Sequence, residues 1–379
     1  KKTEDKIMEI RSRLMQEFDE LTAIDAESLS ERNICDALKV KLQNVGFTVT
    51  EDQAGGQIGG NAGNLYGCLK GTIPGSPVLL SAHMDTVKPG IGKKIIHKQG
   101  RITSDGTTVL GADDIAGIVE ILEGIRQAEE SGRDHRDVEV LFCVAEEMYT
   151  VGSRVFDYSK IRSKEAYVLD LSGGVGIAAN QAPSLISFEI KITGKAAHAG
   201  FEPEKGIHAI RVMAQVIDVI PQGHIGTQTT CNIGTIHGGN GTNIVPETCM
   251  ACGEIRSFSH EEALDCLRKI NETVQQIAEQ NQAKGEVTHT VHLVAYKMDE
   301  NCSCVRHFRA ACEKLGLEGK VVSTFGGSDN NSFAEQGIPG LVLSCGMEKV
   351  HSVKEYIEEE ELQKGADLVT ELICQKEEV

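Results

Sequence analysis

The stretch VLLSAHMDTV, residues 78–87, has the pattern of a buried strand that ends in ionisable side chains. The apolar run that starts at Val78 is typical of a strand covered on both faces of a sheet. His83 and Asp85 close the run, and side chains two residues apart on a strand point to the same side. We therefore expect Asp85 to lie beside the His83 imidazole and to orient it.

Strand-like and helix-like segments alternate on both sides of this stretch. A helical pattern covers residues 112–130, and strand-like runs cover residues 138–147 and 165–173. This alternation predicts an α/β fold with a mostly parallel sheet sandwiched by helices. The glycine-rich segment 54–64 is expected to be a flexible loop.

The pattern changes at about residue 182. Segments in the order strand, helix, strand, strand, helix, strand follow as far as residue 294, which is the order of a ferredoxin-like α+β domain. The α/β pattern then resumes, and 379 residues exceed what one hydrophobic core usually supports. We therefore predict a domain made of residues 1–181 and 295–379, with a smaller domain, residues 182–294, inserted in it.

Composition narrows the class of protein. The chain has 56 acidic and 38 basic residues and a net charge of −18, which argues against nucleic acid or an anionic membrane as a partner. No apolar run reaches the roughly 18 residues of a membrane span, and no signal-peptide core is present at the start. The twelve scattered cysteines, including the close pairs Cys249/Cys252 and Cys302/Cys304, are interpreted as reduced packing residues rather than as a zinc or redox site. We expect a soluble, cytoplasmic protein.

Imidazole and carboxylate groups gather where the predicted strands end. In parallel sheets, ligands bind beyond the carboxyl ends of the strands. Each such residue alone suits an ordinary core or turn role, but together they form a donor set for zinc, manganese or cobalt, and two ions there would activate a water molecule. The strand-end residues of this set are His83, Asp85, Glu146, Glu147 and Asp170, and Asp113, Asp114 and His351 complete it.

Glu146 and Glu147 are adjacent, so on a regular strand they would face opposite sides. They can share one site only if the strand has already turned. In that case one carboxylate is a metal ligand and the other is a general base.

The chain resembles the M20 family of di-metal peptidases, and most of all its tripeptidase (peptidase T-like) branch. The resemblance rests on motifs that occur in order: SAHMDTV, LGADDIAG, VAEE, YVLDLSGG, GKAAHAG, GTNIVPE, GEIRS, GGSDNN and VHSVKEYI. It implies two divalent metal ions, zinc in the first place, with cobalt or manganese as alternatives.

The resemblance also implies roles for single residues. His83, Asp113 and Asp170 would hold one ion, and Asp113, Glu147 and His351 would hold the other, so that Asp113 bridges the two. Asp85 would support His83, and Glu146 would be the general base that takes a proton from the attacking water. Relatives often have a cis peptide bond after the bridging aspartate, so we predict one between Asp113 and Asp114.

By the same resemblance, the insert serves as a lid and, in some relatives, as a dimerisation surface, so a homodimer through the lid is expected. His198 would stabilise the oxyanion, while Asn243 and Arg256 would hold the backbone or terminal carboxylate of the substrate. Without the resemblance, a surface ion pair explains Arg256 equally well. The loop 326–331 is expected to contact substrate, although its composition is also that of an ordinary turn.

The implied activity is release of the N-terminal residue from short peptides, because an aspartate at position 170 resembles the aminopeptidase members. A carboxypeptidase or an N-acyl amino-acid deacylase with the same metal site is the alternative, and an inactive peptide-binding protein is the alternative from another class. Two departures from the branch are Ile115, where lysine is common, and the shorter chain. Strict tripeptide specificity is therefore not carried over.

Overall fold

The computed structural model describes residues 2–376, and the chain divides into two compact units. Unit 1 comprises Lys1–Asn180, Lys297–Ser323 and Ser328–Val379, and unit 2 comprises Gln181–Tyr296 and Thr324–Gly327. Unit 2 contains the whole of the predicted insert. It also contains the short segment Thr324–Gly327, which the strand and helix patterns of the sequence do not reveal.

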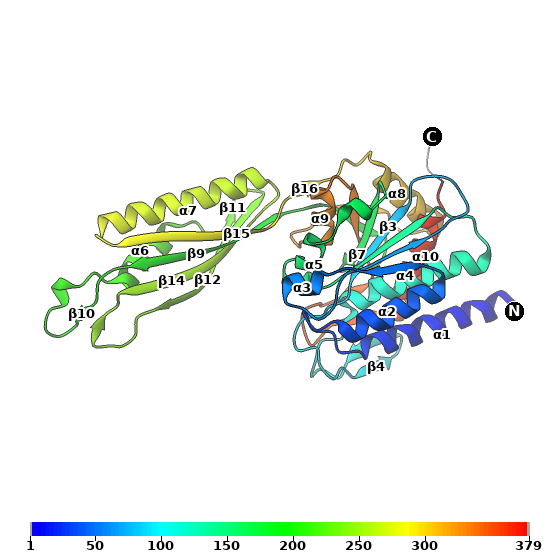
Figure 1. The fold of residues 1–379 in the computed structure, drawn as a ribbon, viewed down its shortest axis with the longest axis horizontal. Helices are drawn as coiled ribbons and strands as arrows, with labels where there is room; N and C mark the ends of the chain where they lie inside the picture. Colours follow the sequence, from blue (N-terminus) through cyan, green and yellow to red (C-terminus); the bar gives the residue numbers. More distant parts are fainter. Residues whose placement is uncertain (1, 377–379) are drawn as a thin grey trace. The chain divides into compact units, whose positions relative to one another are not determined.

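Unit 1 is built on a nine-stranded sheet (Figure 1). In sheet order its strands are β1 (Thr48–Glu51), β2 (Leu65–Leu69), β6 (Val138–Cys143), β3 (Val78–His83), β7 (Ala166–Leu171), β18 (Gly340–Ser344), β8 (Ile177–Ala182) and β16 (Tyr296–Lys297), and β17 (Lys320–Ser323) pairs with β8. Strands β6, β3, β7 and β18 run parallel, whereas β1 with β2, β2 with β6, and β8 with β18 are antiparallel. The predicted mostly parallel sheet is confirmed, and the carboxyl ends of β3, β6 and β7 share one edge.

Both faces of this sheet are buried, as the apolar run at Val78 predicts. Val78, Leu80 and Ala82 of β3 belong to one hydrophobic core, while Leu79 belongs to a second core on the other face. Neighbouring side chains of a strand point to opposite faces, so a strand buried on both sides must be apolar throughout.

Helices cover the two faces of the sheet in unit 1. Helices α1, α2 and α10 pack against α4 on the face of the larger core, and α9 packs against β7 and β18 (Figure 1). The helices of unit 1 are α1 (Lys2–Thr22), α2 (Arg32–Val45), α3 (Ala54–Ile58), α4 (Ala112–Ser131), α5 (Val151–Arg154), α8 (Ser303–Leu315), α9 (Asp329–Glu335) and α10 (Glu359–Ile373). A smaller four-stranded sheet comprises β19 (Met347–Glu348), β20 (Tyr356–Glu358), β5 (Arg101–Ser104) and β4 (Ile95–Lys98).

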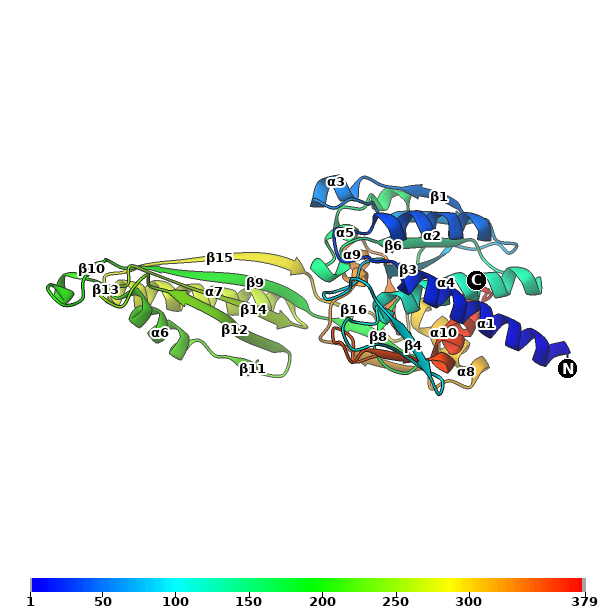
Figure 2. The same cartoon turned by 90° about the horizontal axis from the view of Figure 1, so that it is seen from below.

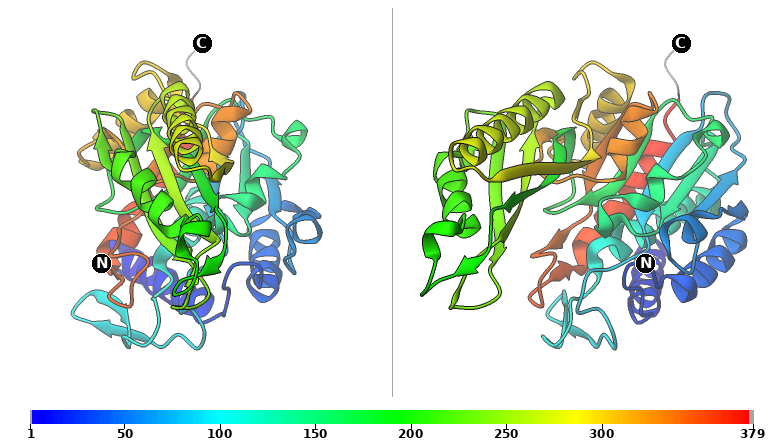
Figure 3. Two further views of the ribbon diagram at one scale, coloured as in Figure 1. Left: turned by 90° about the vertical axis from the view of Figure 1, so that its left-hand side faces the viewer. Right: turned by 60° about the vertical axis from the view of Figure 1, so that its left-hand side comes forward.

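Unit 2 is an antiparallel sheet with two helices on one face (Figures 2 and 3). Its strands in sheet order are β11 (Gly223–Ile225), β12 (Thr229–Gly238), β14 (Thr248–Ser257), β9 (Ser184–Thr193) and β15 (Lys284–Leu293). Helices α6 (Ala209–Val219) and α7 (His260–Gln280) pack on this sheet. The short strands β10 (Ala197–His198) and β13 (Ile244–Val245) form a separate pair. The longer elements β9, α6, β12, β14, α7 and β15 follow the predicted order, and the short strands β10, β11 and β13 are additional to it.

The glycine-rich segment 54–64 differs from the expected open loop. It contains α3, and the carboxylate oxygen Oδ1 of Asp52 accepts hydrogen bonds from the N–H groups of Ala54 at 2.9 Å and Asn64 at 2.8 Å. The two ends of the segment are thus tied to one side chain.

The cysteine pairs have different surroundings. Cys249 is buried and Cys252 is half-buried on β14, whereas the thiols of Cys302 and Cys304 lie 2.9 Å apart at the start of α8. Among the described residues, none of the groups with the spacing of metal ligands contains a cysteine.

Glu120, in the middle of α4, is a fully buried carboxyl group. Neither of its oxygens has a hydrogen-bond partner among the described residues, and a Cβ atom at Gly365 of α10 would overlap it. Burial, together with the charge of Asp114, raises the pKa of Glu120 well above its ordinary value. Between the pKa of Glu120 in the unfolded chain and its higher pKa in the folded state, the folded protein therefore retains a proton on Glu120 that the unfolded chain releases.

This shift predicts a pH-dependent loss of stability. A folded-state pKa above the unfolded value costs stability as pH rises past the unfolded pKa of about 4.5. We expect Glu120→Gln, which cannot ionise, to be more stable than the wild type at pH 8 by on the order of 1–3 kcal/mol, with a smaller difference at pH 5. Urea denaturation at both pH values measures this, with the exposed Glu335→Gln as control. A difference that does not grow with pH would contradict the prediction.

Candidate metal centre

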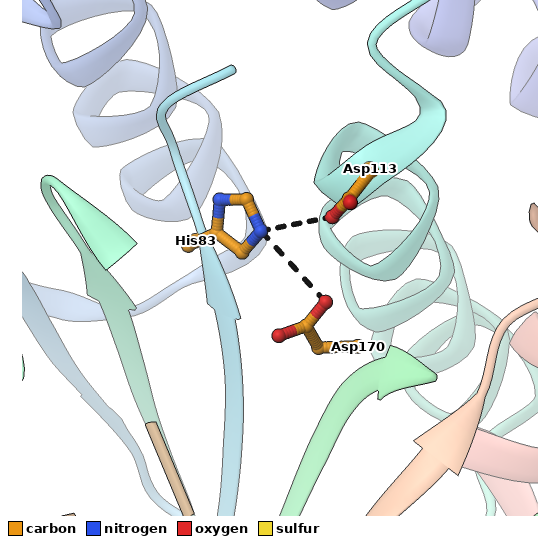
Figure 4. A group of neighbouring side chains, drawn as sticks. All are labelled: His83, Asp113 and Asp170. Carbon is orange, nitrogen blue, oxygen red and sulfur yellow. Dashed lines mark hydrogen bonds and ion pairs between the residues drawn. The ribbon is translucent and has the colours of Figure 1, made fainter. Parts of the chain in front are cut away.

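The side chain of His83 meets three carboxylates at the shared edge of the sheet. Its Nε2 atom lies 3.0 Å from Asp113 Oδ1, 3.8 Å from Asp170 Oδ1 and 4.0 Å from Glu146 Oε2. Figure 4 shows the imidazole facing the carboxylates of Asp113, at the start of α4, and Asp170, on β7. His83, Asp170 and Glu146 come together because β3, β7 and β6 end at the same edge, and the start of α4 adds Asp113.

His351 forms a second group on the other side of Asp113. Its Nε2 atom lies 3.1 Å from Asp113 Oδ2 and 2.9 Å from Glu147 Oε1. The two oxygens of Asp113 therefore face different histidines, which is the arrangement that a bridging carboxylate requires.

Within each predicted ligand set, the ligand atoms lie within 4.8 Å of one another. One set is His83, Asp113 and Asp170, and the other is Asp113, Glu147 and His351. A third set with the same spacing joins His83, Glu146 and Glu147. Glu146 and Glu147 share the site because β6 ends at Cys143 and they lie in the 3-10 helix η1 (Glu146–Met148). The expected turn after the strand is present.

The start of α4 has an irregular backbone, since Asp113 and Asp114 have non-helical φ and ψ angles. The predicted cis peptide bond between Asp113 and Asp114 is present. The carboxylate of Asp114 accepts hydrogen bonds from the N–H groups of His83 at 3.1 Å and Gly117 at 3.3 Å. Ile115, the departure from the branch, is 1% exposed and belongs to the larger core of unit 1, so it is a packing residue.

Asp85 supports both His83 and the turn after β6. The ring atom Nδ1 of His83 lies 2.9 Å from the backbone carbonyl oxygen of Asp85 and 3.3 Å from its Oδ1 atom. The carboxylate also accepts the N–H groups of Glu146 at 2.9 Å and Glu147 at 3.2 Å and the hydroxyl of Ser28 at 2.7 Å. β3 ends at His83, so Asp85 reaches the ring from beyond the strand rather than from within it.

The hydrogen bonds of His83 test whether a cation fits the site. A carbonyl oxygen only accepts hydrogen bonds, so Nδ1 carries the hydrogen and the Nε2 lone pair of a neutral ring faces the oxygens of Asp113 and Asp170. Acceptors that face one another need a proton or a cation between them. Imidazole Nε2 and carboxylate oxygens are donors that divalent transition metals bind, so the residues fit a metal ion.

The electrostatics of the site lead to the same conclusion. Burial, followed by the charge of Asp170, raises the pKa of Glu146 well above its ordinary value, and burial likewise raises the pKa of Asp170. Hydrogen bonds to Asp113 and Glu147 raise the pKa of His351 to about 10. Burial opposes ionisation of Asp113, but His351 and His83 outweigh it and hold the pKa of this carboxyl below its usual range. Carboxylates thus outnumber the bases available to neutralise them, as in a site built for cations.

Sequence reasoning did not identify Glu355 as a residue of the site. Its buried carboxylate accepts the N–H groups of Gly111 at 2.8 Å and Asp113 at 2.9 Å, and it lies on the same loop as His351. It therefore connects the backbone of Asp113 to the loop that carries His351. Backbone N–H groups are present at every residue except proline, so no sequence pattern indicates which of them will need an acceptor.

The predicted substrate residues lie in unit 2. His198 and Asn243 are neighbours, since the N–H group of Ala199 donates to the Asn243 carbonyl at 2.9 Å. The Nδ1 atom of the exposed His198 accepts the N–H groups of Gly200 at 3.1 Å and Phe201 at 3.2 Å, so its Nε2 atom carries the hydrogen.

Arg256 lies away from these two residues within unit 2. Arg256 is near the last residue of β14. The first residue of β14, Thr248, is at the other end of the strand and closely follows β13, which pairs with β10. The Arg256 guanidinium donates to Glu254 Oε1 at 2.8 Å and to the carbonyl oxygen of Phe325 at 2.9 Å. The structure therefore does not gather His198, Asn243 and Arg256 into one cluster within unit 2.

Comparison with known proteins identifies the family. Residues 181–282 match the model of the peptidase dimerisation domain, and residues 64–195 match that of peptidase family M28. The structure of aminopeptidase PepT from Bacillus cereus is 38% identical, with a TM-score of 0.91 over 96% of this chain and 98% of that one. A tripeptidase structure from Staphylococcus aureus is 33% identical, with a TM-score of 0.93 and the same coverage. The YqjE protein of Bacillus subtilis is 37% identical over 95% of this chain and 97% of its own.

The chain belongs to the M20 peptidase family. Within it, the chain is peptidase T-like, and it is a metal-dependent peptidase. Among the described helices of this M20 peptidase, none combines the length and apolar character that crossing a membrane requires.

The position of Glu355 in this M20 peptidase predicts an effect on metal affinity. In Glu355→Gln only one side-chain oxygen remains to accept the two N–H groups, so Asp113 should lose its fixed orientation. We expect metal bound by Asp113, Glu147 and His351 to be held about 10- to 100-fold more weakly, the usual cost of removing a group that orients a ligand. Titration with a competing chelator measures the affinity. The exposed Glu313→Gln is the control, and equal affinities in all three proteins would contradict the assignment.

Proposed function

We propose that the protein is a two-metal aminopeptidase that releases the N-terminal residue of short peptides. The observation that carries the proposal is the position of Asp113, with one carboxylate oxygen 3.0 Å from His83 and the other 3.1 Å from His351. The similarity to aminopeptidase PepT and to a tripeptidase favours this activity over a carboxypeptidase or deacylase. An inactive binding protein would have no need of so many buried carboxylates.

In this proposal His83, Asp113 and Asp170 hold one ion, and Asp113, Glu147 and His351 hold the other. Zinc fits the mixture of imidazole and carboxylate ligands, and cobalt and manganese fit it as well. Ions held by these residues would polarise the scissile carbonyl and lower the pKa of the attacking water.

Glu146 is proposed as the general base. Its Oε2 atom lies 4.0 Å from His83 Nε2, beyond hydrogen-bond range, whereas Glu147 Oε1 is within 2.9 Å of His351. This asymmetry suits Glu147 to ligation and Glu146 to proton transfer. In this role the Glu146 carboxylate would accept a proton from the attacking water and return it to the leaving amine.

The substrate residues of unit 2 are proposed to serve two sites of a homodimer. At ~3.3 Å per residue, the ends of β14 are separated by roughly 25–30 Å, longer than a tripeptide of about 10 Å. We propose that His198, through its Nε2–H group, and Asn243 act at the site of a partner subunit, while Arg256 binds a substrate carboxylate. The matched dimerisation domain supports this arrangement.

Free thiols at all described cysteines support a cytoplasmic location.

The proposed base predicts a specific loss of activity. Glu146→Gln should keep the metal content of the wild type, because neither proposed ligand set includes Glu146, and lower kcat by about 10²–10⁴-fold. Metal analysis and initial rates on a tripeptide measure the two quantities, with Glu313→Gln as control. Substantial residual turnover in Glu146→Gln would show that another group is the base.

The direction of cleavage is tested with tripeptides blocked at one end. We expect hydrolysis of a tripeptide with a free amine and a blocked carboxylate, and none of the same peptide with an acetylated amine. Mass spectrometry of the products identifies the released residue. Turnover of amine-blocked substrates alone would replace the aminopeptidase with the deacylase or carboxypeptidase activity.

A further inference from the structure

The turn that carries Glu146 and Glu147 is held through its backbone by side chains from distant parts of unit 1. Successive N–H groups donate to a side-chain oxygen: Val144 to Asn64 Oδ1 at 3.0 Å, Ala145 to Glu31 Oε1 at 3.0 Å, Glu146 to Asp85 Oδ1 at 2.9 Å, and Glu147 to Asp85 Oδ2 at 3.2 Å. We call Asn64, Glu31 and Asp85 the amide cradle.

The backbone of this turn needs such support. Ala145, Tyr149 and Thr150 have φ values of 49°, 66° and 55°, in the left-handed region that residues other than glycine rarely adopt. Conformations of this kind persist only where the surrounding structure enforces them. Removing an acceptor of the amide cradle should therefore let the turn relax and move the Glu146 carboxylate.

The position of Glu31 is costly unless it serves the turn. Glu31 is the residue before α2, where a side chain usually caps the helix, but its side chain makes no capping hydrogen bond. The carboxylate is 0% exposed instead, and it accepts the N–H groups of Leu29 at 3.0 Å and Ala145. Its other oxygen has no partner among the described residues. Burying a carboxylate costs free energy, and the start of α2 does not require it.

Asn64 joins the two ends of the same turn. Its side chain is 0% exposed, accepts the N–H group of Val144 and donates to the carbonyl oxygen of Gly152 at 2.9 Å. It also donates to Asp52 Oδ2 at 2.8 Å, so the tied glycine-rich segment fixes its position. A Cβ atom at Gly152 would overlap the Val144 carbonyl, so glycine is required for this close approach.

We propose that Glu31 and Asn64 are positioning residues for the general base. They do not touch substrate and act by holding the backbone from Val144 to Ala145, as Asp85 holds the next two residues. The inference rests on the proposed function of Glu146. Because the hold on the backbone is separate from catalysis, it is also measurable without any substrate.

The test compares variants that keep or remove the acceptor. Glu31→Gln keeps an acceptor oxygen on a side chain of the same length, and Glu31→Leu removes the oxygen while the side chain keeps a similar volume. Asn64→Leu removes the amide oxygen that accepts the Val144 N–H group. Glu139→Gln is the matched control, because Glu139 is a fully buried carboxylate on the same strand β6 and accepts the N–H group of Ser163 at 2.9 Å, far along the strand from the turn.

We expect Glu31→Leu and Asn64→Leu to lower kcat by about 10- to 100-fold, the cost of misplacing a catalytic group by about 1 Å, with KM and metal content unchanged. Glu31→Gln should restore a kcat close to the wild type, since its amide oxygen still accepts the Ala145 N–H group. Hydrogen exchange followed by mass spectrometry should show faster exchange of residues 143–150 in the two leucine variants only.

An active wild type with an unchanged kcat in Glu31→Leu and Asn64→Leu would overturn the inference. An equal loss in Glu139→Gln would also overturn it, because the effect would then be general destabilisation. If the wild type and Glu313→Gln hydrolyse no peptide, the proposed function fails, and hydrogen exchange then decides alone. Faster exchange of residues 143–150 in the leucine variants supports the hold on the turn, and unchanged exchange overturns it.

Discussion

The structure depends on the carboxylate of Asp113, whose two oxygens lie against two histidines from distant parts of the chain. His83 is the last residue of β3, and His351 belongs to a loop near the end of the chain. A carboxylate placed between two imidazoles, with further buried carboxylates around it, concentrates negative charge that the protein alone does not balance. Divalent cations would supply the missing charge, which explains why a metal-dependent peptidase tolerates these buried carboxylates beside the exposed His351.

A second use of carboxylates surrounds the first. Asp85, Glu31 and Glu355 accept backbone N–H groups of the segments that carry the site residues. Charged acceptors make stronger hydrogen bonds than neutral ones, so a few side chains can hold irregular backbone in place. The two kinds of carboxylate have different roles. One kind faces the proposed metal site, and the other accepts hydrogen bonds from the backbone segments that carry the metal-site residues.

The residues with proposed roles in the reaction are divided between the two units of the chain. Unit 1 contains every residue proposed to bind metal or transfer a proton, and unit 2 contains His198, Asn243 and Arg256. Within unit 2, the pair His198 and Asn243 is separated from Arg256 by most of the length of β14. A single short peptide cannot span that distance, and this separation supports the proposed homodimer.

The sequence by itself determined the local and periodic features. Alternating apolar patterns predicted the sandwiched parallel sheet and the inserted α+β domain, because burial of strands and helices leaves a periodic record. Ligand-type side chains at strand ends predicted that His83, Glu146 and Asp170 lie at one edge, because parallel strands end there, whereas the place of Asp113 beside them followed from the family resemblance. Only the tertiary structure decided the roles of Glu31, Asn64 and Glu355, and the addition of Thr324–Gly327 to unit 2. Their partners are backbone groups or distant strands, and such contacts depend on how the chain folds back in space rather than on any local pattern.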